Sequence, residues 1–145
     1  MELDEALPTA RGTHRSILTT IKRDGRPQLS NVMHAVDDTG LVRISTTADR
    51  AKAHNLRREP WAALHVTGPT FFSYVVLEGE AEVSAVAAEP DDTVVEELVA
   101  VYREIGGEHD DWDAYRRSMV EDRRLVIRFR PARAYGVVPP PGGSQ

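Results

Sequence analysis

Alternating apolar and polar positions mark six segments of the chain as extended. β-Branched residues recur in these segments, and Gly, Pro and Asp-Gly pairs separate them, as expected for strands joined by turns. The first three segments follow one another through short turns, which predicts an antiparallel meander. The six predicted strands are residues 16–21, 28–36, 41–47, 61–67, 71–83 and 124–130.

Apolar residues spaced three and four apart predict helices elsewhere. Residues 49–59 form a short helix that Asp49 caps, and the proline that follows ends it. A longer helix covers residues 90–105, and a second covers residues 110–121. Residues 1–12 form a lead-in or a short helix. The pattern therefore predicts a mainly β protein with packed helices, of the α+β class.

One domain accounts for this pattern. A chain of 145 residues fits a single core, and an aromatic content of 6% favours an aliphatic barrel. Gly79 marks a bulge or bend in the long fifth strand. We predict a single domain over residues 1–138 and a disordered Pro/Gly tail over residues 139–145.

Charge is distributed unevenly along the chain, whose net charge is −5. Residues 78–113 hold thirteen Asp and Glu and one Arg, whereas residues 11–58 hold ten Lys and Arg and four Asp. A basic region in an acidic protein suits a small polyanion better than a nucleic acid. The acidic N-terminus and the lack of a long apolar run argue against a signal peptide and a membrane span, so cytoplasm is the expected compartment.

Basic and hydroxyl side chains meet where the third predicted strand leads into the following helix. Ser45, Thr46 and Thr47 end the strand, and Arg50 and Lys52 lie at the helix start. Free N–H groups at a helix N-terminus favour an anion, and the two cations add to that preference. A solvated basic helix covering a barrel edge is the alternative. The polar side chains on the preceding strand favour a ligand: Gln28, Ser30 and Asn31.

Protein-borne catalytic chemistry is not evident. The chain has no Cys, and its five His lack the close spacing of metal ligands, so we predict no metal site. Neither a P-loop nor a nucleophile elbow is present. This pattern agrees with an enzyme whose cofactor carries the reaction. We interpret Trp112, Tyr115 and Met119 as helix surface packed on the barrel rather than as a cofactor box.

Several motifs together resemble those of the pyridoxamine-phosphate-oxidase-like flavoprotein family. The match is closest to its deazaflavin-dependent branch, small actinobacterial proteins that use coenzyme F420. The resemblance extends over most of the chain, although the C-terminal segment that binds substrate in true pyridoxamine phosphate oxidases is missing. The matching stretches are residues 25–32, 45–56, 72–74, 102–112 and 135–136.

This resemblance implies a six-stranded antiparallel split β-barrel, the FMN-binding split barrel, that forms a homodimer with cofactor sites at the interface. Arg50 and Lys52 would hold the phosphate, and residues 72–74 would come from the other subunit. The cofactor-binding residues implied are Gln28, Ser30, Asn31, Ser45, Thr46, Thr47, Arg50, Ala51, Lys52, Asn55, Phe72, Ser73 and Tyr74.

The leading hypothesis is therefore a coenzyme F420-dependent reductase that transfers a hydride to a small conjugated or unsaturated molecule. An FMN-binding oxidoreductase of the same fold is one alternative, and a non-catalytic F420 carrier is another. His34, Tyr74 and Tyr135 are the candidate proton donors or substrate contacts. A core or interface role is the alternative for each of these three.

Overall fold

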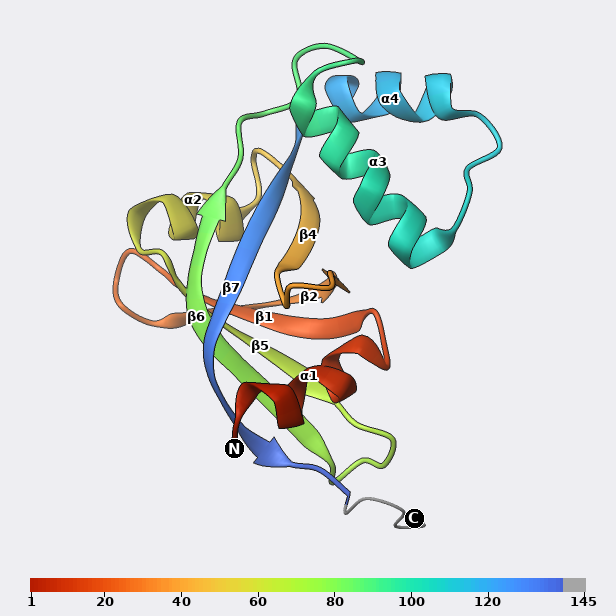
Figure 1. Cartoon of the computed structure of the whole chain (residues 1–145). Coiled ribbons are helices and arrows are strands. Elements are labelled where there is room, and N and C mark those ends of the chain that lie inside the picture. The colour runs from red at the N-terminus through yellow and green to blue at the C-terminus, as the bar shows by residue number, and fades with distance from the viewer. Residues whose placement is uncertain (140–145) are drawn as a thin grey trace.

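The computed structural model describes residues 1–139, which form one curled antiparallel sheet with four helices outside it (Figure 1). The helices of this part of the chain are α1 (Leu3–Arg11), α2 (Ala51–Arg58), α3 (Thr93–Gly106) and α4 (Trp112–Glu121). Its strands are β1 (Arg15–Ile21), β2 (Pro27–Met33), β3 (Ala35–Val36), β4 (Val42–Thr47), β5 (Trp61–Thr67), β6 (Tyr74–Val83) and β7 (Arg124–Val137).

Seven strands are present in the described chain instead of six, because His34 divides the predicted strand 28–36 into β2 and β3. The His34 ring is buried, where Nε2 lies 2.8 Å from the Ala10 carbonyl oxygen and Nδ1 lies 2.7 Å from the Ser16 hydroxyl. Its backbone N–H donates to the His14 carbonyl. These contacts turn the chain out of β2, so β2 and β3 pair with different strands.

The sheet order is β2-β1-β5-β6-β7-β4-β3, and β2 and β3 at its two ends are consecutive in the chain. The sheet is thus a curled half-barrel. The successive antiparallel pairings of the predicted meander are present, since β1 pairs with β2 and β3 with β4, but the break at His34 places the two pairs at opposite ends of the sheet. The prediction did not include the other neighbour of β4, which pairs along its whole length with β7. That partner follows β4 by some eighty residues, so local turn signals could not reveal the pairing.

Two separate hydrophobic clusters stabilise the chain. The first fills the barrel and includes Leu18, Phe129 and the inner faces of α1 and α2. The second lies between α3 and α4 and reaches the sheet at Val126. Figure 1 shows the two arrangements: α3 and α4 lie together at one end of the molecule, and α1 lies against the sheet at the other. No helix of residues 1–139 is long and apolar enough to cross a membrane.

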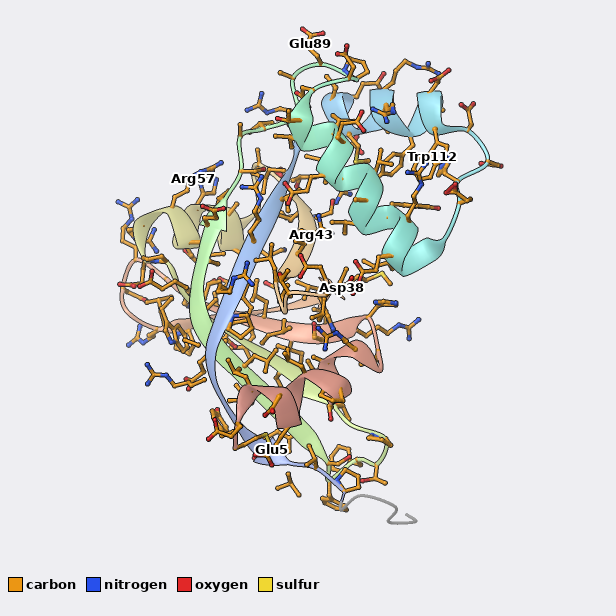
Figure 2. The ribbon with its side chains drawn as sticks, in the orientation of Figure 1. Glu5, Asp38, Arg43, Arg57, Glu89 and Trp112 are labelled. Carbon is orange, nitrogen blue, oxygen red and sulfur yellow. The ribbon has the colours of Figure 1, made fainter. Side chains whose placement is uncertain are left out.

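Ion pairs attach α3 to the sheet. Arg128 of β7 donates from Nε to both carboxylate oxygens of Glu97, at 3.0 and 2.9 Å. Arg43 of β4 lies 3.8 Å from Glu97 and 3.9 Å from Glu104. Figure 2 shows Arg43 between the sheet and α3. These partly buried pairs fix the position of α3 relative to β4, which also leads into α2.

Most other predicted boundaries agree with the structure, and Gly79 is the bulge position. The β6–β7 register shifts between Glu78 and Gly79. A Cβ on Gly79 would lie 2.2 Å from the Arg130 carbonyl oxygen, so only glycine fits. The last strand is longer than predicted and runs to Val137. The predicted tail beyond Pro139 lies outside the described residues.

Lowering the pH from about 7.5 to about 5.5 is expected to reduce the free energy of unfolding. Burial lowers the pKa of His34 from its usual 6.5, although the Ala10 carbonyl opposes this. At pH values below the pKa of His34 in the unfolded chain, the unfolded chain therefore binds more protons than the folded protein. The free energy of unfolding is highest above that pKa and decreases as the pH falls. Urea titrations at both pH values measure the change.

The variant His34→Gln should show a weaker dependence of unfolding free energy on pH than the wild type. His54→Gln, a change at an exposed imidazole of α2, is the matched control and should keep the wild-type dependence. Equal slopes for wild type and His34→Gln would show that another group causes the acid destabilisation.

Candidate functional site

A cavity of about 450 Å³ lies where β2, the end of β4 and the start of α2 meet. We call it the cation cradle. Eight of the thirteen predicted cofactor-binding residues line it, together with Arg124 at the start of β7. β2 is an end strand of the sheet, and this edge of the sheet lies next to α2. The eight residues are Gln28, Ser30, Asn31, Thr46, Thr47, Arg50, Ala51 and Lys52.

The lining of the cation cradle is cationic without a compensating acid. Arg50, Lys52 and Arg124 contribute three positive groups, and no Asp or Glu is among the residues that line the cavity. Burial lowers the pKa of Lys52, and repulsion from Arg50 and Arg124 lowers it further. Like charges held together and partly buried are stabilised by a bound anion. The geometry therefore defines an anion-binding site.

The start of α2 differs from the prediction in its cap. Arg50 is the N-cap residue and makes no side-chain cap hydrogen bond. Asp49, the predicted cap, instead accepts a hydrogen bond of 2.6 Å from the Thr47 hydroxyl. That bond holds the carboxylate outside the first turn, which leaves helix N–H groups without a capping side chain. A bound anion could accept from those groups.

A second cavity of about 460 Å³ opens beside the cation cradle, and we call it the helical pocket. Asn31, Thr46, Lys52 and Arg124 line both cavities, so the two are adjacent. The helical pocket also includes Ser45, another predicted cofactor residue. Its remaining lining comes from β2 and from α3 and α4: Val32, Met33, Val101, Tyr102, Ile105, Gly106, Tyr115 and Met119.

Two of the proton-donor candidates, Tyr74 and Tyr135, lie on the outer face of the sheet. Cross-strand pairs place Asn31, Ile17, His65, Val76 and Tyr135 in one row of opposed residues on that face. Tyr74 stacks on the His65 ring at 5.3 Å between centroids. Asn31 and Tyr135 are four strands apart, roughly 19 Å at about 4.8 Å per strand. Within one chain, Tyr135 therefore does not reach the cation cradle.

Two other predicted site residues face the interior instead of the cation cradle. His34 is fully buried, and its ring contacts Ser16 and Ala10 as described, so the structure gives it a core role rather than a proton-donor position. Asn55 is buried in α2 and donates to the Thr20 hydroxyl at 3.1 Å, while its own oxygen accepts from Arg58. Its role here is to attach α2 to β1.

Residues 71–73 form a turn, whereas the sequence predicts a strand that begins there. The Ser73 hydroxyl accepts from the Thr70 N–H at 3.1 Å and donates to the Thr70 carbonyl at 2.9 Å, which closes the turn. Phe71 and Phe72 consequently project outward, with 82% and 81% of their surface exposed. Phe72 and Ser73 therefore lie away from the cation cradle of their own chain.

Sequence reasoning missed Arg124 and the helical pocket. Arg124 lies opposite Thr47 in the β4–β7 ladder, and only that long-range pairing brings it to the site. Tyr115 and Met119 were interpreted as helix surface packed on the barrel, yet they line a cavity. Burial raises the pKa of Tyr115 to about 12, and its hydroxyl donates to the Leu98 carbonyl at 3.1 Å. The available signal was the aromatic residues on both helices, together with Met119 on α4.

A curled antiparallel sheet with an anion site between its end strand and a helix defines a split-barrel, flavoprotein-like class of protein. The sequence profile described as Pyridoxamine 5'-phosphate oxidase matches residues 3–138, and the chain belongs to this family. The family resemblance noted in the sequence is thereby confirmed.

Solved structures agree on the fold and differ in what they are said to bind. A conserved hypothetical protein from Mycobacterium tuberculosis, Rv2991, is 26% identical, with a TM-score of 0.72 over 94% of this chain and 84% of that one. A structure described as F420 reductase is 22% identical, with a TM-score of 0.66 over 90% and 95%. HutZ, described as a heme storage protein from Vibrio cholerae, is 16% identical, with a TM-score of 0.66 over 94% and 95%.

Proposed function

We propose that this protein is a coenzyme F420-dependent reductase that acts on a small conjugated molecule. The observation that carries the proposal is the cation cradle, where three cations and a helix start face one cavity without a lining acid. Likeness to a structure described as F420 reductase supports the choice of coenzyme. An FMN-binding oxidoreductase of the same fold is the alternative. Likeness to HutZ makes heme a third ligand to test.

The residues present fit a phosphorylated coenzyme. Arg50 and Lys52 would hold its phosphate, and the hydroxyls of Thr46 and Thr47 would assist. Gln28 and Ser30 are two residues apart in β2 and therefore lie on the same face of the sheet. Their partners on β1 are Thr20 and Leu18. The Gln28 and Ser30 side chains would contact the ring system. When bound, the reduced deazaflavin supplies a hydride, while the protein positions the acceptor and excludes water.

A titration of the apo protein with coenzyme F420, FMN and hemin in parallel tests the proposal. We expect F420 to bind in the micromolar range or tighter and more tightly than FMN or hemin. Arg50→Ala and Lys52→Ala should each weaken F420 binding by about 1–3 kcal/mol, because each removes a charge-assisted contact. Ligand fluorescence reports binding of F420 and FMN, and absorbance reports hemin.

Arg57→Ala is the matched control for the titration, because Arg57 belongs to the same helix, is exposed and does not line the cation cradle. Figure 2 shows it pointing away from the sheet. Tighter binding of FMN or hemin would replace F420 in the proposal. F420 binding without oxidation of its reduced form by any acceptor in a broad panel would instead favour a carrier.

We also propose that two copies pair through the outer face of the sheet. Leu29, Met33, Tyr135 and Val137 lie on that face, and each has more than half of its surface exposed. Exposed apolar side chains on one face of a sheet are typical of an interface. Pairing would let Tyr74 and Tyr135 of one copy approach the cation cradle of the other, which they cannot reach in their own chain.

Sedimentation velocity is expected to show a dimer for the wild type and a monomer for the double variant Leu29→Lys, Met33→Lys. Two buried lysines at an interface without partners cost several kcal/mol, enough to dissociate a micromolar dimer. Asp38→Lys, at an exposed turn (Figure 2), is the control and should remain dimeric. A wild-type monomer at about 100 µM, far above such a dissociation constant, would contradict the pairing.

A further inference from the structure

The helical pocket has two chemically different ends. Its apolar end is formed by β2 and the helices, with Val32, Val101 and Ile105 among the lining side chains. Its polar end is formed by Ser45, Thr46, Lys52 and Arg124. Cavities of this size, with apolar walls and a few convergent polar groups, are typical of small-molecule sites. The lining therefore suits a ligand with one apolar body and one polar group.

Arg124 lacks a strong partner within the described chain. Its Nε is buried and makes no hydrogen bond there, and its Nη1 lies 3.4 Å from the Ser45 hydroxyl, a long contact. A buried guanidinium N–H without an acceptor is unfavourable, and a carboxylate offers two oxygens in matching geometry. No Asp or Glu lines the helical pocket, so the missing acceptor would come from a ligand.

Flat, polarizable surfaces surround the apolar end. The Tyr102 and Tyr115 rings lie 5.0 Å apart at an interplanar angle of 58°. Gly106 leaves room beside Tyr102, since a Cβ there would lie 3.4 Å from the ring. Met33 and Met119 complete the wall. Aromatic rings and thioethers make favourable contacts with flat conjugated molecules.

From these contacts we propose that the helical pocket binds the substrate, and that the substrate is a flat conjugated carboxylic acid whose carboxylate Arg124 holds. This inference rests on the proposed function for the chemistry, because the reductase requires a conjugated acceptor. Lys52 and Asn31 line both cavities, so the acid lies directly beside the ligand of the cation cradle. Arg50 and Lys52 would bind the phosphate of the coenzyme, and Arg124 would bind the carboxylate of the substrate.

Two probes that differ only in charge test this assignment: trans-cinnamate and its methyl ester. Calorimetry and ligand-observed NMR measure their affinity, first without coenzyme and then with saturating F420. We expect cinnamate to bind the wild type at least about tenfold more tightly than the ester, because only the acid pairs with the guanidinium. Arg124→Gln should remove this advantage, and Arg124→Lys should restore part of it.

Matched variants separate the two ends of the pocket. Arg123→Gln makes the same charge change at the neighbouring, exposed residue and should keep the preference for the acid. Ile105→Ser should weaken acid and ester by the same factor, because it changes only the apolar wall. Thermal unfolding of every variant establishes that it is folded before its affinity is compared.

The outcomes test the carboxylate site independently of coenzyme binding. Loss of the preference for cinnamate in Arg124→Gln, with a smaller loss of F420 affinity than in Lys52→Ala, supports it. Equal binding of acid and ester by the wild type overturns it. Displacement of cinnamate by F420 also overturns it. The same holds if Arg124→Gln weakens the binding of F420 but not that of cinnamate. If F420 does not bind the wild type but the acid preference and its loss in Arg124→Gln persist, the proposed function fails and the carboxylate site stands.

Discussion

Lys52→Glu is expected to reduce coenzyme F420 affinity by more than about 100-fold, equivalent to more than about 3 kcal/mol. The change removes one cation of the cation cradle and places an anion beside the phosphate, so lost attraction and new repulsion act together. Partial burial of Lys52 makes salt screening weaker than at an open surface. Fluorescence titration at two ionic strengths measures the loss.

The control for Lys52→Glu is Arg57→Glu, which reverses charge in the same helix at an exposed position outside the cation cradle. It should weaken binding by no more than about threefold, an effect that disappears at high salt. Similar losses in both variants would mean that F420 responds to the overall charge of α2 rather than to a specific phosphate contact.

Phe129→Ala is expected to lower the free energy of unfolding by about 3–5 kcal/mol, the largest stability effect that we predict. Phe129 is fully buried in the barrel cluster. It also lies opposite Val42 on one side and Ala81 on the other, so β7 presents it where three strands meet. Removal of the ring leaves a cavity that these strands cannot close without breaking their pairing.

Urea titration monitored by circular dichroism measures the effect of Phe129→Ala, and Phe129→Leu provides a graded comparison. The leucine variant should lose less than about 1.5 kcal/mol, since it fills most of the space. If alanine cost no more than leucine, the barrel would have collapsed around the site, and Phe129 would not be the residue that holds β4, β6 and β7 together.

Local patterns determined most of the secondary structure, because each depends on neighbours in the chain. Strand alternation, the start of α3 close to residue 90 and Gly79 as a bulge were all readable in this way. The prediction failed where a contact from a distant segment outweighed the local preference. His34 reads as one more strand residue, yet its contacts with α1 and β1 end the strand.

The residues of the candidate site also fall into those that the sequence predicts and those that only tertiary contacts place there. The sequence by itself pointed to the region of the cation cradle, because hydroxyls, amides and cations gather on two strands and a helix start, and eight of the thirteen residues that the resemblance implies line it. Only the tertiary structure decided that Arg124 joins them, that Asn55 faces inward, and that Tyr74 and Tyr135 lie on the outer face. The physical reason is that cross-strand register and helix packing are set by burial of the whole core, which no local pattern encodes.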